Sequence, residues 1–261
     1  MKSEFSLALG GGAARGLAHI GVIQRLEELG RIPREISGTS IGAVIGAFYA
    51  AGYTSTDMKK IALDTNILKL VDLDLKNGFF KGNKIVKYLE KYLGEMEFSD
   101  LTIPLSIVAT DIDTGEKVIF REGKVIDAIR SSISLPGIFR PYKYMGRSLI
   151  DGGIMENLPI SLLSDKYPIV AVSVRMDFSK KSIKKIERII PSGISNSYTI
   201  LRKTLGIIMV NNENVSLKEH PNTFLICPNR EDIDFYDFGK MSPMIEEGYQ
   251  SSESLIPYFS H

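Results

Sequence analysis

Short apolar runs alternate along this chain with longer segments in which apolar residues recur at helical spacing. Residues 5–9, FSLAL, form the kind of apolar run that a buried strand requires. From about Arg15 to Leu29, apolar residues return every three or four positions, and Gly30 follows where a helix C-terminus favours glycine. The pattern therefore predicts a strand followed by a helix at the start of the chain.

The same alternation continues to the end of the sequence. A short strand at 34–37, REIS, leads into 38–52, GTSIGAVIGAFYAAG, whose small residues favour a helix packed closely on a sheet. Further helices are expected at 83–94, 124–133 and near 242–256, and further strands at 104–112, 116–120, 148–153, 168–174 and 223–228. Such alternation is typical of an α/β fold. Because no repeat, low-complexity tract or linker interrupts it, residues 1–261 are expected to form a single domain.

Composition and charge narrow the classes of function. The 261 residues carry a formal net charge of +1, with 44% hydrophobic and 24% charged residues. Such a weak net charge does not favour nucleic acid as a partner, and the basic cluster at 180–188 is interpreted as a solvated helix face. The single cysteine, Cys227, excludes an intrachain disulfide and fits a reducing compartment, so we expect a cytoplasmic protein.

The sequence offers no stretch with the length and apolar character of a membrane span. The longest apolar stretch, 41–53, is well short of the ~20 residues that a spanning helix needs. The few apolar residues ahead of Gly10 are too few for a secretory signal. We therefore expect no transmembrane segment, and contact with a membrane only as a peripheral protein at its surface.

Residues 38–42, GTSIG, match the pattern G-x-S-x-G between a predicted strand and a predicted helix. A sharp turn flanked by Gly38 and Gly42 would present the hydroxyl of Ser40 at a helix N-terminus, as a nucleophile elbow does. In the simpler interpretation, Ser40 is an ordinary helix N-cap in a glycine-flanked turn. The position of the pattern between strand and helix favours the nucleophile.

Three consecutive glycines follow the first strand, although each costs ordering entropy and packs no side chain. The backbone amides of Gly10, Gly11, Gly12 and Ala13, with that of Ile41 after Ser40, are placed to stabilise a negative oxygen on a substrate. The alternatives are a plain tight turn or a nucleotide-binding loop. The spacing does not match the nucleotide-loop pattern G-x-x-x-x-G-K-[ST]. It also fails the pattern G-x-G-x-x-G, because Arg15 stands in the last position after Gly10 and Gly12, where that pattern requires glycine.

A serine nucleophile needs a base, and the three histidines are poor candidates for it. His19 falls within the first helix, where a packed side chain is expected, and His261 is terminal. His220 has the chain order of an α/β-hydrolase triad, but it precedes a proline at the start of a predicted strand. The hydrolase elbow also follows several strands, whereas Ser40 follows the second.

Asp151 is the candidate that remains. It ends a predicted apolar strand and is followed by Gly152 and Gly153, so other backbone can approach its carboxylate closely. An Asp-Gly-Gly sequence can also be a merely structural turn. Its combination with Ser40 and the glycine turn favours a role in acyl transfer.

The stretches GGGAARG, GTSIG and DGG, in this order and on these elements, resemble the patatin-like phospholipase family, most closely its small bacterial members. The segments at 109–116, 128–139 and 233–249 extend the resemblance over nearly the whole chain. The resemblance implies a three-layer α/β sandwich with a mostly parallel central sheet flanked by helices. It also implies a Ser-Asp dyad without histidine, carried over to Ser40 as nucleophile and Asp151 as general base.

The resemblance further implies an oxyanion hole at the glycine-rich turn and hydrolysis of lipid carboxylic esters through an acyl-enzyme, as in a phospholipase A or lysophospholipase. Arg15 matches the basic residue of the family just after the turn, and we interpret it as supporting the loop rather than pairing with an anionic head group. Two rival hypotheses remain open. One is an α/β-hydrolase-type esterase or thioesterase that uses His220, and the other is a non-catalytic module that binds an acyl group or an anion.

Two further segments bear on specificity and cofactors. Residues 64–82, with Phe79 and Phe80 beside a glycine, are a candidate lid or surface-docking loop, although they could equally cap the core. The acidic turn at 111–116, DIDTGE, lacks the ligand number and spacing of an EF-hand loop, so we interpret it as a hairpin. We therefore expect no metal and no cofactor.

Overall fold

The structure is a computed structural model that describes residues 4–70, 72–74, 79–175, 195–228 and 237–260. The main sheet consists of β1 (Ser6–Leu9), β2 (Glu35–Thr39), β5 (Leu105–Asp111), β6 (Lys117–Phe120), β7 (Tyr142–Tyr144), β8 (Arg147–Asp151), β9 (Ile169–Val172) and β10 (Phe224–Ile226). Its strand order is β10-β9-β1-β2-β5-β8-β7, and β6 also pairs with β5. A separate pair is formed by β3 (Leu73–Asp74) and β4 (Phe79–Phe80).

Most of the main sheet is parallel. Strands β10, β9, β1, β2 and β5 run in the same direction, whereas β6, β7 and β8 are joined by antiparallel pairing. Parallel strands are buried on both faces, which explains the apolar runs of β1 and β9. In β1, Leu7 and Leu9 enter one apolar cluster and Ala8 enters another, because successive side chains point to opposite faces.

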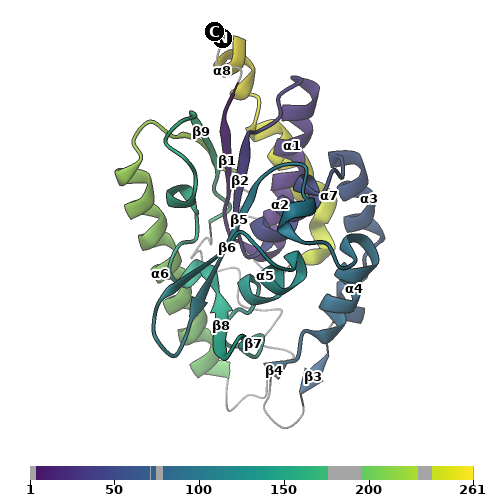
Figure 1. The fold of residues 1–261 in the computed structure, drawn as a ribbon, viewed down its shortest axis with the longest axis vertical. Coiled ribbons are helices and arrows are strands. Elements are labelled where there is room, and N and C mark those ends of the chain that lie inside the picture. The colour runs from purple at the N-terminus through teal and green to yellow at the C-terminus, as the bar shows by residue number, and fades with distance from the viewer. Residues whose placement is uncertain (1–3, 71, 75–78, 176–194, 229–236, 261) are drawn as a thin grey trace.

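Helices cover both faces of the sheet. They are α1 (Ala18–Glu28), α2 (Ile41–Ala50), α3 (Ser55–Asp64), α4 (Asn83–Leu93), α5 (Val125–Ser132), α6 (Ser195–Glu219), α7 (Met241–Ser251) and α8 (Leu255–Ser260). Figure 1 shows α6 on one side of the sheet, with α1, α2, α5 and α7 on the other. The predicted three-layer α/β sandwich with a mostly parallel sheet is thereby confirmed. Among the described helices, none is both long enough and apolar enough to cross a membrane.

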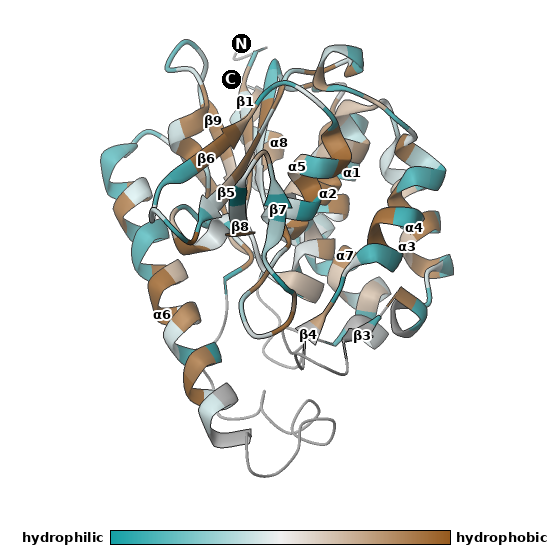
Figure 2. Ribbon diagram, turned by 60° about the horizontal axis from the view of Figure 1, so that its bottom comes forward, coloured by the Kyte–Doolittle hydropathy of each residue, from teal (hydrophilic) through white to brown (hydrophobic). Residues whose placement is uncertain are grey.

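Most of the predicted elements occur within a few residues of their expected positions, and two helices were not predicted. The helix expected from Arg15 begins with a 3-10 turn at Ala13–Leu17, and the helix expected near 242–256 is divided into α7 and α8. The apolar pattern did not reveal α3 or the 25-residue helix α6. In α6, Ile200 and Ile207 are exposed while Leu205 and Met209 are buried, so apolar residues do not mark a single face (Figure 2).

The C-terminal part of the chain completes the same sheet and core. Strands β9 and β10 extend the sheet beyond β1, and α7 packs against α1. The contact between these helices needs two glycines, since a Cβ on Gly21 would lie 2.0 Å from the carbonyl oxygen of Ile245 and one on Gly248 would lie 1.9 Å from that of Ala18. The two helices therefore pack backbone against backbone.

Candidate active site

Ser40 occupies a strained turn between β2 and α2. Its φ of 54° and ψ of −121° lie where a residue with a Cβ costs of order 1–3 kcal/mol. The Ser40 amide donates a hydrogen bond of 2.8 Å to the hydroxyl of Ser132, at the end of α5. Ala13 in the glycine turn also has a positive φ, of 46°. Strained backbone therefore occurs at both of the elements that the sequence singled out.

The glycines on either side of Ser40 allow α2 to begin directly against neighbouring backbone. A Cβ on Gly42 would lie 2.1 Å from the carbonyl oxygen of Leu9, and one on Gly38 would lie 2.7 Å from the Cα of Ala43. Neither contact can relax by rotating a side chain, because both involve backbone. These two positions thus require glycine for the turn that presents Ser40.

Replacing Gly42 by alanine is expected to lower the free energy of unfolding by about 3 kcal/mol, since a methyl group would overlap the end of β1. Gly46→Ala, one turn further along α2, is the matched control. Its Cβ would first meet side chains, at 3.2 Å from Ile36 and 3.4 Å from Leu105, and alanine favours the helix by about 1 kcal/mol. Urea unfolding of both variants measures the difference, and equal losses would contradict this explanation.

The glycine turn borders Ser40, but only part of it has free amides. A Cβ on Gly11 would lie 3.3 Å from the Cβ of Ser40. The amide of Gly10 donates to the carbonyl oxygen of Val172 and that of Gly11 to the carbonyl oxygen of Asn157, each at 3.0 Å. The assignment of Gly10 and Gly11 as oxyanion donors is therefore corrected, because an amide already paired with a carbonyl is not available to a substrate.

The amides that remain as oxyanion donors belong to Gly12, Ala13 and Ile41, for which no hydrogen-bond partner occurs among the described residues. Gly12 needs to be glycine, because a Cβ there would lie 2.4 Å from the carbonyl oxygen of Val174. The oxyanion hole expected from the sequence is thus reduced from five amides to three, and these three remain a proposal.

Two side chains of the first helical segment, those of Arg15 and His19, are buried next to the glycine turn. His19 donates from Nε2 to the carbonyl oxygen of Gly10 at 2.8 Å, and burial lowers the pKa of its imidazole to about 4. His19 is therefore a neutral, packed residue, as expected. Arg15 is 3% exposed and donates to the carbonyl oxygen of Arg175. Its position agrees with support of the loop.

Asp151 lies at the end of β8, close to Ser40. In the sheet, Thr39 of β2 is paired with Val108 of β5, and the next residue, Ala109, is paired with Asp151. The Ser40 hydroxyl donates a hydrogen bond to the Asp151 carboxylate. The sheet register therefore brings together two residues that are more than a hundred positions apart in the sequence.

The carboxylate of Asp151 is 1% exposed and accepts a second hydrogen bond, of 2.8 Å, from the amide of Gly153. Burial raises its pKa to about 6, although the hydrogen bonds from Gly153 and Ser40 act in the opposite direction. Gly152 allows the loop to pack on β5, since a Cβ there would lie 2.2 Å from the carbonyl oxygen of Val108. The two glycines thus have distinct functions in holding Asp151.

Three residues that contact this arrangement were not singled out from the sequence. Ser132 accepts from the Ser40 amide, the carbonyl oxygen of Ser134 accepts from the Asp151 amide at 3.0 Å, and Asn157 contacts the glycine turn. Ser132 and Ser134 belong to the segment at 128–139 that resembles the family, and this resemblance was the sequence signal that could have found them. Asn157 lies six residues after Asp151 and had no signal apart from that proximity.

His220 lies at the opposite edge of the sheet from Ser40. It follows α6 and precedes β10, whose first residue, Phe224, is paired with Val170 near the start of β9. Ser40 instead follows the last residue of β2, at the carboxyl edge of the parallel strands (Figure 1). His220 donates a hydrogen bond from Nδ1 to the carbonyl oxygen of Ser216 at 2.9 Å. This position argues against His220 as the base.

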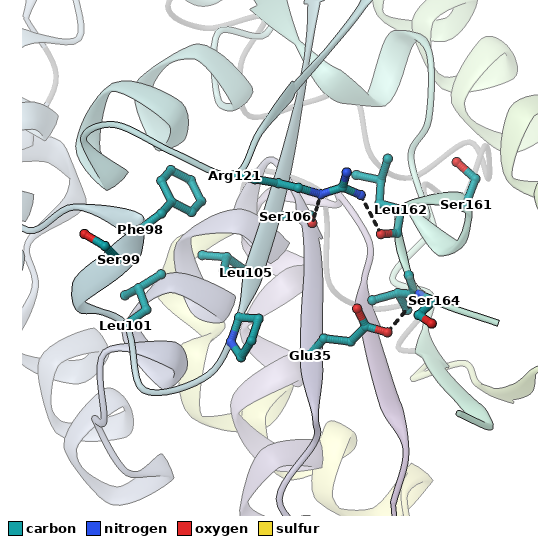
Figure 3. Close-up of a pocket in the computed structure, with 12 residues that line it drawn as sticks. Glu35, Phe98, Ser99, Leu101, Leu105, Ser106, Arg121, Ser161, Leu162 and Ser164 are labelled. Atoms are coloured by element: carbon teal, nitrogen blue, oxygen red, sulfur yellow. Dashed lines mark hydrogen bonds between the residues drawn. The ribbon is translucent and has the colours of Figure 1, made fainter. Parts of the chain in front are cut away.

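A cavity of about 620 Å³ also lies away from Ser40. It opens where β2 and β5 begin, at Glu35 and Leu105, and Figure 3 shows Arg121 across from them. Arg121 donates to the hydroxyl of Ser106 and to the carbonyl oxygen of Leu162, both at 2.9 Å. The cavity is therefore at the amino edge of the sheet, and neither Ser40 nor Asp151 lines it.

The acidic turn after β5 is the hairpin that the sequence predicted. Strands β5 and β6 pair antiparallel, and Arg147 lies 3.8 Å from the carboxylate of Asp111 and 3.6 Å from that of Glu116. Ser148 donates to Asp113 at 2.6 Å. Within the described ranges, no cluster of three histidine, cysteine or acidic residues is arranged to hold a metal ion.

The candidate lid at 64–82 lies partly outside the described residues, which omit 71 and 75–78. Asp72 accepts hydrogen bonds from the amides of Gly82 and Asn83, at 2.7 and 2.8 Å, and thereby caps α4. The Phe80 amide donates to the carbonyl oxygen of Ile138 at 2.8 Å. The segment thus contacts the loop after α5, and its function as a lid remains a prediction.

A strained serine between a parallel strand and a helix, beside a buried carboxylate, is the geometry that a nucleophile elbow requires. The family model described as patatin-like phospholipase matches residues 7–164, more than half of the chain. The chain belongs to the patatin-like phospholipase family.

Its relatives agree with this assignment. An uncharacterized NTE family protein of Mycobacterium tuberculosis is 38% identical over 178 residues, which cover 67% of this chain and 49% of the relative. Patatin-like phospholipase domain-containing protein 6 of Mus musculus is 34% identical over 170 residues, or 61% of this chain and 12% of that protein. This chain thus spans about half or less of the curated relatives that it matches.

Solved structures confirm the fold. VipD from Legionella pneumophila superposes with a TM-score of 0.62 at 16% identity, covering 98% of this chain and 67% of that one. The type III effector protein ExoU gives a TM-score of 0.51 at 14% identity, covering 98% of this chain and 53% of that one. At these identities the likeness concerns the fold alone.

Proposed function

We propose that this protein is a serine hydrolase of lipid carboxylic esters, with Ser40 as nucleophile and Asp151 as general base. The observation that carries the proposal is the hydrogen bond between the Ser40 hydroxyl and a carboxylate that is 1% exposed, with its pKa raised to about 6. A carboxylate with a raised pKa is a stronger base for the hydroxyl proton while it stays ionised at neutral pH. Membership of the patatin-like phospholipase family supports the same activity.

The proposed reaction has two halves. In the first, Asp151 takes the proton of the Ser40 hydroxyl, whose oxygen attacks the ester carbonyl carbon, and the resulting oxyanion accepts hydrogen bonds from Gly12, Ala13 and Ile41. The intermediate collapses to an acyl-serine as the alcohol leaves with the proton held by Asp151. In the second half, Asp151 deprotonates a water that attacks the acyl-serine, and the carboxylic acid leaves as Ser40 regains its proton.

An apolar cluster beside the oxyanion turn supports a substrate with an acyl chain. Buried Leu135, Leu205 and Met209 pack together with partly buried Ala13 and Ile154. Ala13 belongs to the glycine turn, and Ile154 lies three residues after Asp151. The cluster therefore contacts both the proposed oxyanion turn and the loop that holds Asp151. A phospholipid or lysophospholipid at a membrane surface is the substrate that we propose.

The pH dependence of turnover follows from the pKa of Asp151. Only the carboxylate can accept the proton, and its pKa is raised to about 6, so kcat/KM should rise with pH through about 6 and level off above it. Below that pH it should fall about tenfold per unit. Hydrolysis of p-nitrophenyl butyrate between pH 4 and pH 9 measures the profile. A value of kcat/KM that is constant from pH 4 to pH 7 would contradict a base of this pKa.

A fluorophosphonate probe tests the proposed function directly, because it labels an activated serine and no other. Labelling of the intact protein, mapped to Ser40 by peptide mass spectrometry, is the expected result. A non-catalytic module that binds an acyl group or an anion would remain unlabelled. Absence of labelling in folded protein, together with absence of esterase activity, would overturn the proposal.

We also propose that residues 1–261 act as one domain. The family match ends at residue 164, yet β9 and β10 lie beyond it and pair into the same sheet as β1. The rings of Phe5 and Phe259 are in tilted contact, with centroids 5.1 Å apart, so the start of the chain and the last helix share one core. The expectations of a cytoplasmic, membrane-peripheral protein without a cofactor remain predictions.

A further inference from the structure

Asn157 holds the Gly11–Gly12 peptide from one side. The Gly11 amide donates to the Asn157 carbonyl oxygen at 3.0 Å, and the Asn157 Nδ2 donates to the Gly11 carbonyl oxygen at 3.2 Å. In a trans peptide the carbonyl and the following amide point in opposite directions. The Gly12 amide is therefore turned away from Asn157, and the hydrogen bond to the Gly11 carbonyl decides its direction.

The orientation of the Asn157 side chain is determined by its neighbours. Its Nδ2 also donates to Glu213 Oε2 at 3.2 Å, and both of its partners can only accept, so the nitrogen and not the oxygen faces them. The Oδ1 atom lies on the other side, 2.7 Å from where a Cβ of Gly11 would be and 2.9 Å from where one of Gly153 would be. Asn157, which is 4% exposed, thus fills the space between the two glycine loops.

Two adjacent residues of α6 hold Asn157 in this place. The Asn157 amide donates to Asn212 Oδ1 at 2.9 Å, and Asn212 Nδ2 donates to the Gly153 carbonyl oxygen at 2.8 Å. Glu213 is fully buried, and its carboxylate is paired with Arg175 Nε at 2.7 Å. One turn of α6 therefore contacts the Asp151 loop directly and the oxyanion turn through Asn157.

We propose that Asn157, held by Asn212 and Glu213, is a positioning residue that aims the Gly12 amide at the oxyanion. The inference rests on the proposed function, since it deepens the description of the same site. An oxyanion forms only along the reaction and not in the bound ester. Loss of Asn157 should therefore reduce kcat and leave KM nearly unchanged, whereas a general loosening of the fold would affect both.

The test compares Asn157→Ala with the wild type in hydrolysis of p-nitrophenyl butyrate. We expect kcat to fall by about 10²–10³-fold, as when an oxyanion donor is lost, with KM within about threefold of the wild-type value. Asn157→Asp should be equally slow, because a carboxylate has no N–H to donate to Gly11 and faces Glu213. The pH at which kcat/KM reaches half of its plateau should not move in Asn157→Ala, since Asp151 keeps its own partners.

Asn212→Ala and Asn211→Ala form a matched pair on α6. Asn212 contacts the site, whereas Asn211 is exposed, so Asn212→Ala should lose about 10- to 100-fold in kcat and Asn211→Ala should retain the wild-type rate. This pair decides the question even if Asn157→Ala unfolds, which thermal unfolding followed by circular dichroism measures.

Folded Asn157→Ala protein with an unchanged kcat overturns the inference, as does an Asn212→Ala rate within twofold of that of Asn211→Ala. If the wild type hydrolyses the ester through Ser40 and these variants do so equally well, only the inference fails. If the wild type is neither labelled by a fluorophosphonate nor active, the proposed function fails, and the inference fails with it.

Discussion

Ser40→Ala is expected to lower kcat/KM by about four orders of magnitude or more, because no other group can form the acyl-enzyme in the proposed reaction. Labelling by a fluorophosphonate should disappear at the same time. The variant should still fold, since the elbow is held by the hydrogen bond from the Ser40 amide to Ser132, which alanine retains. Ester hydrolysis, probe labelling and thermal unfolding on one preparation measure all three results.

Ser99→Ala is the matched control for this substitution. Ser99 is exposed and lies at the amino edge of the sheet, beside the cavity of Figure 3, so its loss should change neither turnover nor labelling. A folded Ser40→Ala protein that still turns over the ester at the wild-type rate would remove Ser40 from the mechanism.

Asp151→Asn is expected to be nearly as inactive as Ser40→Ala, because an amide of the same size cannot take the hydroxyl proton. His220→Ala should remain close to the wild type, since His220 lies at the other edge of the sheet. In a histidine triad the order is reversed, because the imidazole transfers the proton and the carboxylate orients it. Values of kcat for the two variants separate the alternatives, and inactive His220→Ala beside active Asp151→Asn would favour the triad.

Asp151→Asn should also unfold at the same temperature as the wild type or at a higher one. The pKa of Asp151 is raised from 3.8 to about 6 in the folded state, so its burial as a carboxylate costs stability at neutral pH. That cost begins to decrease as the pH falls through about 6 and is lost near the ordinary pKa of 3.8. An amide removes the cost at every pH. A lower unfolding temperature at pH 7 would show that the hydrogen bonds of the carboxylate outweigh its burial.

Local patterns were sufficient to predict the elements that carry the candidate site. The spacing of apolar residues predicted β1, β2, β5 and β8 within a few residues, because each is a short buried run bounded by glycine or proline. The strained turn at Ser40 was also predictable, since glycines at 38 and 42 have few uses other than a sharp turn between a strand and a helix. These features depend on residues that are neighbours in the sequence.

Helix α6 is an element that such local patterns could not predict. Its apolar residues face both the core and the exterior, so no single stripe marks it in the sequence. Nothing in the sequence of residues 211–214, NNEN, indicates that Asn212 and Glu213 point toward two loops that lie far away along the chain. The residues that support the candidate site are therefore harder to recognise from the sequence than the residues that compose it.

The sequence by itself determined the α/β class, the strained turn at Ser40 and the glycine turn, and the resemblance implied that Ser40 acts with Asp151. Only the tertiary structure decided which amides remain available: those of Gly10 and Gly11 donate to Val172 and Asn157, which come from distant segments. The physical reason is that a tight turn follows from local sterics, whereas the partner of a backbone amide depends on whichever strand or loop packs beside it.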